Sequence, residues 1–88
     1  MNNSISEVVK EYVLDVEGLY VTVKGRISKT ENNKFRWQIS HYCKPSETAA
    51  GVYRPSNTTF NSFDEAEREL KLYMNSFTTI DVTPNEYY

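Results

Sequence analysis

The sequence predicts an α+β domain in which a three-stranded antiparallel sheet packs on one C-terminal helix, with a short helix at the N-terminus. Three observations carry this prediction. Residues 19–28 and 34–43 each alternate apolar and polar side chains with the period of a strand. A short link, residues 30–33, joins these two segments. Residues 63–77 repeat their apolar side chains at the spacing of an amphipathic helix.

The two alternating segments are expected to form a hairpin of adjacent antiparallel strands. Asn32 and Asn33 in the link tolerate the positive φ of a hairpin turn. The apolar side of the hairpin is expected to comprise Leu19, Val21, Val23, Gly25 and Ile27 from the first strand and Phe35, Trp37, Ile39, His41 and Cys43 from the second. The even-numbered residues then emerge together on the polar side of the sheet.

The predicted helix has a clear start. Ser62 and Glu65 have the spacing of a capping box, and Asp64 places negative charge in the first turn, where the helix dipole favours it. Its apolar stripe consists of Phe63, Ala66, Leu70, Tyr73, Met74 and Phe77. This stripe is expected to cover the apolar side of the hairpin.

The remaining segments are less regular. Residues 51–54 predict a short third strand, which Pro55 ends or confines to a sheet edge. The N-terminus allows two interpretations, because residues 4–12 carry a helical stripe after a capping pair, Ser4 and Glu7, whereas residues 12–17 alternate as a strand would. We favour a short helix over residues 4–12 followed by an extended segment. Residues 1–80 are then one domain, and residues 81–88 a flexible C-terminal tail.

Composition limits the location and the size of the protein. A chain of 88 residues supports one small hydrophobic core. Cys43 is the only cysteine, so no internal disulfide can form. No apolar run is long enough to cross a membrane, and the first residues lack the basic and apolar regions of a signal peptide. We therefore expect a cytoplasmic protein with no membrane partner.

Catalysis is not expected from this sequence. His41 and Cys43 lie two residues apart on the apolar side of a predicted strand, without the third group that a nucleophilic site needs or the further ligands that a zinc site needs. The three glycines are scattered and form no phosphate-binding loop. The sequence thus predicts no enzyme, no metal and no cofactor.

Positive charge is concentrated in the middle of the chain. Between Gly18 and Phe60 there are seven basic and two acidic residues, so the remainder must carry −7 to give the net charge of −2. The candidates for contact with nucleic acid are Lys24, Arg26, Lys34, Arg36, Gln38, Tyr42 and Arg54. Arg and Gln can read base edges from a two-stranded ribbon, and Lys and Arg can contact phosphates. The competing interpretation is a solvated sheet face, which the low isoelectric point of about 5.3 favours.

Three motifs resemble a known kind of DNA-binding domain. They are Lys24-Gly25-Arg26-Ile27, Lys34-Phe35-Arg36-Trp37-Gln38-Ile39 and Phe60-Asn61-Ser62-Phe63-Asp64-Glu65-Ala66. Together they resemble the APETALA/ethylene-response-factor domain and the arm-binding domain of phage integrases, over about residues 20–77. The resemblance implies three antiparallel strands on one helix, with the strands in the major groove. It further implies that Arg26, Arg36, Lys24, Lys34 and Trp37 face DNA, although strict alternation places Trp37 in the core.

A protein partner is the alternative hypothesis. The acidic side of the helix, with Glu65, Glu67 and Glu69, and the tyrosine-rich surface could both form an interface, because Tyr and Arg are enriched in interface hot spots. Such a protein would be a small phage-type inhibitor or regulator, whereas a nucleic-acid-binding module would be an accessory in phage or mobile-element DNA transactions. The sequence leaves the choice between DNA, RNA and protein open, and also the oligomeric state.

Overall fold

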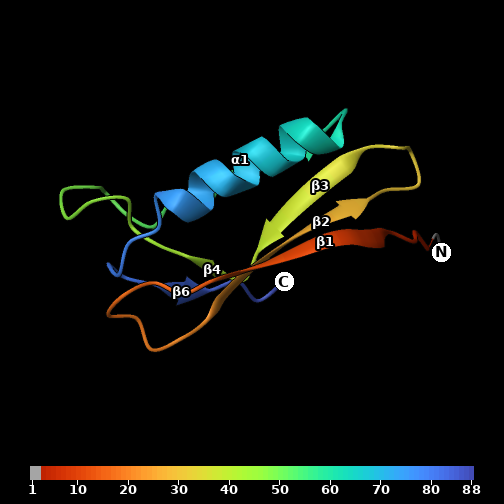
Figure 1. Ribbon diagram of the computed structural model, residues 1–88. Coiled ribbons are helices and arrows are strands. Elements are labelled where there is room, and N and C mark those ends of the chain that lie inside the picture. Colours follow the sequence, from red (N-terminus) through yellow and green to blue (C-terminus); the bar gives the residue numbers. More distant parts are fainter. Residues whose placement is uncertain (1–2) are drawn as a thin grey trace.

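The computed structural model describes residues 3–88, which form an antiparallel sheet with one helix lying across it (Figure 1). The sheet has four strands in the order β1-β2-β3-β5. The strands of this sheet are β1 (Glu7–Leu14), β2 (Val23–Lys29), β3 (Phe35–Ile39) and β5 (Thr59–Phe60), and the helix is α1 (Phe63–Asn75). The α+β class expected from the sequence is confirmed, but the expected strand count of three is wrong.

The predicted hairpin is present as β2 and β3. These strands pair antiparallel, with Gly25 opposite Ile39 and Ile27 opposite Trp37. In the link, Asn33 adopts the positive φ expected there, at 58°. Both strands are shorter than predicted: Val21 lies before β2 and is 44% exposed, although it belongs to the expected apolar set.

A second, two-stranded sheet forms where the predicted second strand breaks. Ser40 ends β3: its backbone N–H donates to the Lys24 carbonyl (2.8 Å), and its Oγ accepts from the Lys24 N–H (2.7 Å). The chain then continues as β4 (His41–Tyr42), which pairs antiparallel with β6 (Thr83–Pro84). Residues 81–88, expected to be a flexible tail, thus include a strand that pairs with the end of the hairpin.

The expected N-terminal helix is wrong, because residues 7–14 form the edge strand β1. Its register against β2 places Tyr12 opposite Gly25 and Leu14 opposite Val23, on the side that α1 covers. The register shifts between Val8 and Lys10, as at a β-bulge. The apolar residues there, whose spacing resembles that of a helix, therefore belong to an irregular strand. Pairing with β1 satisfies the backbone groups along the edge of β2 that faces away from β3, which a short N-terminal helix would leave unpaired.

The expected third strand at residues 51–54 is also wrong. β5 takes the place beside β3, pairing Phe60 with Phe35 and Thr59 with Arg36. Residues 51–54 remain outside the strands, with Tyr53 donating its N–H to the Cys43 carbonyl (3.1 Å). Pro55 cannot donate a backbone hydrogen bond, so the ladder cannot continue through it.

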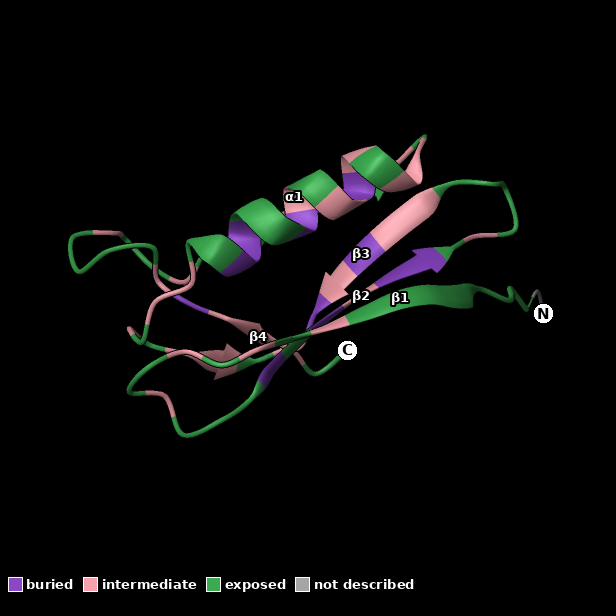
Figure 2. Cartoon of the chain, in the orientation of Figure 1, coloured by how far each residue is buried: buried purple, intermediate pink, exposed green. Residues whose placement is uncertain are grey.

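The core lies between α1 and the side of the sheet that β2 and β3 present to it (Figure 2). Its largest fully buried side chains are Ile27, Ile39, Leu70 and Val23. Trp37 is 4% exposed, so the alternation correctly placed it in the core. The helix starts as expected: the Glu65 N–H donates to Ser62 Oγ (3.2 Å), and Ser62 Oγ donates to Glu65 Oε1 (3.1 Å).

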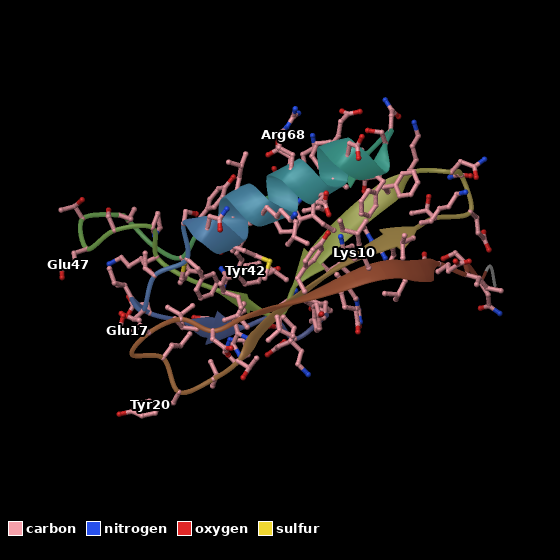
Figure 3. All side chains as sticks on the ribbon, viewed as in Figure 1. Lys10, Glu17, Tyr20, Tyr42, Glu47 and Arg68 are labelled. Carbon is pink, nitrogen blue, oxygen red and sulfur yellow. The ribbon has the colours of Figure 1, made fainter. Side chains whose placement is uncertain are left out.

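A polar bridge joins β1 to α1 above the core. The Tyr12 hydroxyl donates to Glu67 Oε2, and Lys10 Nζ lies 3.3 Å from the same oxygen, between strand and helix (Figure 3). Lys71, one turn further along α1, lies 3.7 Å from it. The hydrogen bond from Tyr12, followed by the bond from Lys10 and the charges of both lysines, lowers the pKa of Glu67 although partial burial opposes this.

Gly25 permits the close approach of α1 to β2, and its replacement tests this packing. A Cβ at Gly25 would lie 3.0 Å from Leu70 Cδ1 and 3.2 Å from Met74 Sδ, whereas a Cβ at Gly51 would meet nothing within 4 Å. We expect Gly25→Val to lower the free energy of unfolding by about 1–3 kcal/mol through overpacking. The control Gly51→Val should change it by no more than about 0.5 kcal/mol. Urea denaturation measures both, and equal effects would contradict the packing argument.

The bridge at Glu67 predicts a pH dependence of stability. Because the pKa of Glu67 is lower in the folded chain, its ionised form adds stability above its unfolded pKa of about 4.5, and this is lost as the pH falls through the folded pKa. Tyr12→Phe removes the largest cause, so Glu67 should titrate nearer 4.5 and stability should fall less below that pH. Carboxylate NMR titration and acid denaturation measure this. Tyr20→Phe, at a fully exposed tyrosine, is the control and should leave the pKa of Glu67 unchanged.

Candidate nucleic-acid interface

Three of the predicted contact residues do emerge on one side of the sheet, opposite to α1. Arg26 pairs with Gln38 and Ser28 with Arg36 in the β2–β3 register, so Arg26, Arg36 and Gln38 share a face. Arg26 Nε donates to Gln38 Oε1 (2.9 Å). The expected orientation of these side chains is therefore present. The predicted cations differ, however, in whether other side chains of the protein already contact them.

Arg26 is already engaged by other parts of the chain. Its guanidinium carbon lies 4.3 Å from the ring centroid of Tyr88, within the range of a cation–π contact. Glu11 of β1 is opposite Arg26 in the neighbouring register. Burial raises the pKa of the Tyr88 hydroxyl, with Arg26 opposing and Glu11 adding to the shift, so these three side chains form one local group. Arg26 is thus covered by Tyr88 and lies opposite an acidic residue of β1.

The two lysines of the predicted block do not join the arginines equally. Lys24, at the start of β2, is exposed. Lys34 lies before β3, and its Nζ donates to Asn61 Oδ1, next to the start of α1. The structure therefore does not bring the four expected cations into one block. Trp37, which the resemblance places against DNA, is in the core.

The other predicted residues gather around a cleft beside the end of β3. It has a volume of about 190 Å³, and no carboxylate lines it. Its lining residues are Arg36, Trp37, Gln38, Ile39, Tyr42, Pro55, Thr58, Asn85 and Tyr87. A neighbouring hollow of about 440 Å³ shares Tyr42, Asn85 and Tyr87 and adds Arg54 and Glu86. We call the two together the C-terminal cleft, because Asn85 and Tyr87 line both parts.

Arg36 is the least satisfied cation in this cleft. Its Nε is buried and has no hydrogen-bond partner within residues 3–88, and the same holds for Nε1 of its neighbour Trp37. Both atoms are donors only. A buried donor without an acceptor is costly, so an acceptor group that reached the Arg36 guanidinium would stabilise it. In the neighbouring hollow, the Arg54 guanidinium lies 5.6 Å from the Tyr42 ring centroid.

Asn85 holds the C-terminal side of the cleft in place. Its backbone N–H donates to the Ser40 carbonyl and its Nδ2 to the Ile39 carbonyl, both at 2.8 Å. Its Oδ1 accepts the N–H of Tyr87 (3.0 Å), whose side chain is 87% exposed. Sequence reasoning missed Asn85 and Tyr87, because their position depends on the pairing of β6 with β4. The adjacent tyrosines Tyr87 and Tyr88 are the one local feature of the sequence that could have indicated a contact surface here.

The three acidic residues proposed for a protein partner do not form one surface. Glu67 points to β1 and belongs to the bridge with Tyr12 and Lys10. Glu65 is the capping partner of Ser62, and Glu69, one turn later, lines a groove on the other side of α1. Arg68 projects from α1 away from the sheet (Figure 3). The acidic helix therefore contributes to two separate environments.

The residues considered for catalysis have structural partners. His41 Nδ1 lies 2.8 Å from Ser40 Oγ, and the buried Cys43 Sγ accepts the N–H of Thr78 (3.3 Å). In the described part of the chain, no three His, Cys, Asp or Glu side chains lie close enough together to hold a metal ion. Over the same residues, no helix has the length and apolar character needed to span a membrane.

The comparisons with known proteins leave the function open. No family model, no curated protein and no solved structure matches this chain. The resemblance to the APETALA-type and integrase arm-binding domains therefore stays a prediction, and function has to be inferred from the site itself.

Replacement of Asn85 tests whether this residue holds the C-terminal side of the cleft. Asn85→Asp removes the donor to Ile39 and places a carboxylate against a carbonyl oxygen. We expect amide hydrogen exchange at residues 83–88 to accelerate about tenfold or more, as the removal of a hydrogen bond worth about 1–2 kcal/mol implies. Asn32→Asp, at an exposed turn residue, is the matched control. Unchanged exchange in Asn85→Asp would show that other contacts hold this segment.

Proposed function

We propose that the protein is a small, non-enzymatic module that binds single-stranded nucleic acid in the C-terminal cleft. The observation that carries the proposal is Arg36, whose buried Nε lacks an acceptor in the part of the cleft that no carboxylate lines. Phosphate and base carbonyl oxygens are acceptors that a guanidinium binds well. Tyr42 and Tyr87 lie beside it, and aromatic rings of this kind stack on unpaired bases.

The geometry favours a single strand over a duplex. Reading the major groove requires an open two-stranded ribbon, but Tyr88 covers Arg26 and Glu11 lies beside it. A cleft with two arginines, two tyrosines and two side-chain amides suits a short piece of extended strand with splayed bases. Cys43 is a free, buried thiol, as expected of a protein that acts in the reducing cytoplasm.

An oligonucleotide titration tests this function. We expect the protein to bind a fluorescent single strand of about 10 nucleotides more tightly than the matching duplex. Arg36→Gln should weaken binding about tenfold or more, since a charge-assisted hydrogen bond is worth about 1.5–3 kcal/mol. Together with Arg54→Gln it should reduce the slope of log K against log salt by about 1.4, because each phosphate that is no longer neutralised accounts for about 0.7. Fluorescence anisotropy at several salt concentrations measures both effects.

The control for this titration is Arg68→Gln, which removes an exposed arginine from α1 on the side away from the sheet. It should leave affinity within about twofold, because it changes only the general charge. Absence of binding by the unaltered protein at low salt would contradict the proposal. Equal decreases of affinity in Arg36→Gln and Arg68→Gln would instead show nonspecific attraction.

A further inference from the structure

A second hollow lies between α1 and the segment that precedes β5. It has a volume of about 470 Å³, larger than the cleft beside β3. Its apolar walls are Trp37, Tyr53, Pro55, Phe60, Leu72 and Tyr73. We call it the aromatic groove. Its volume is within the range of sites that bind small ligands or side chains of a partner.

The groove is pre-formed by a network of rings. The Tyr73 ring lies 5.9 Å from those of both Trp37 and Tyr53, measured between centroids. The Tyr73 hydroxyl donates to the Tyr53 carbonyl (2.8 Å) and accepts the Cys43 N–H (3.3 Å), which holds residue 53 against the end of the helix. A ligand would therefore not have to order these aromatic walls, which reduces the cost of binding.

Two large side chains at the groove remain open to solvent. Leu72 is 58% exposed and Tyr53 is 55% exposed. Leu72 lies outside the helical stripe that covers the sheet, whose buried members are Ala66, Leu70, Tyr73 and Met74. The side chains of Leu72 and Tyr53 offer apolar contact area that the chain itself does not use.

The charge of the groove is negative. Among its lining residues Glu69 is the only charged one, and the others with polar side chains are Ser56, Asn57, Ser76 and the tyrosines and tryptophan. Arg68 approaches Glu69 only to 4.0 Å, with both side chains exposed, so solvent weakens this pair. The carboxylate is thus available to a cation, and the adjacent ring faces are also attractive to one.

We infer that the aromatic groove docks a short segment of a partner protein in which an Arg or Lys lies beside a large apolar side chain. The cation lies over the exposed ring of Tyr53 and pairs with Glu69, while the apolar side chain packs on Leu72 and Phe60. This interaction goes beyond the proposed nucleic-acid contact, and the residues that would make it, Tyr53, Phe60, Glu69 and Leu72, do not line the C-terminal cleft. In this interaction Glu69 and Tyr53, a member of the tyrosine-rich surface, bind the same cation of the partner.

NMR titration with a defined peptide tests the inference. The probe is the acetylated and amidated peptide Leu-Arg-Leu, and its comparison is Leu-Glu-Leu. We expect the arginine peptide, added to about 5 mM, to shift the amide resonances of Tyr53 and Leu72. The glutamate peptide should bind at least about fivefold more weakly. Glu69→Gln should weaken binding of the arginine peptide about fivefold, whereas Glu47→Gln, at an exposed residue that does not line the groove, should not.

Several results would overturn the inference. These are no shift at Tyr53 or Leu72 at the highest concentration, equal affinity for both peptides, or shifts centred on Arg36 and Asn85 instead. Self-association that Leu72→Ser abolishes would assign the groove to a second copy of the chain. The outcome is separable from that of the nucleic-acid proposal, because the oligonucleotide is expected to perturb Arg36 and Tyr42 and to bind normally to Glu69→Gln.

Discussion

The contact of α1 with the β2–β3 hairpin is the interaction on which the rest of the structure depends. Gly25 lets Leu70 and Met74 lie directly on β2, and Ile27, Ile39 and Trp37 fill the space beside them. A domain of this size has one such core, so its alternating face cannot be repositioned without loss of the fold. This contact places both the polar side of the sheet and the groove beside the helix.

The break at Ser40 is the second determinant, because it creates the C-terminal cleft. If β3 continued straight, residues 41 and 42 would extend the hairpin. Instead Ser40 is tied to Lys24, and β4 turns to pair with β6. This brings Asn85 and Tyr87 beside Arg36, from which they are distant in the chain. The C-terminal cleft is thus a product of two short strands whose pairing is nonlocal.

The charges are divided according to this architecture. Arg36 and Arg54 lie at the C-terminal cleft, with Glu86 as its one carboxylate, whereas Glu69 is the one charged residue among those that line the aromatic groove. Trp37 and Pro55 line both hollows, so a common core wall supports them. A small domain can in this way present one surface suited to acceptor-rich ligands and another suited to cations.

The hairpin, the helix start and the inward direction of Trp37 follow from local patterns, because periods of two and 3.6 residues and a capping pair can be recognised in the sequence alone. Three other features follow from contacts in the folded chain: residues 7–14 form a strand, β5 replaces the expected strand at 51–54, and Tyr88 covers Arg26. Each of these depends on a partner distant in the chain. A strand or a terminal segment is stabilised by the surface on which it packs. The local sequence pattern does not identify that surface.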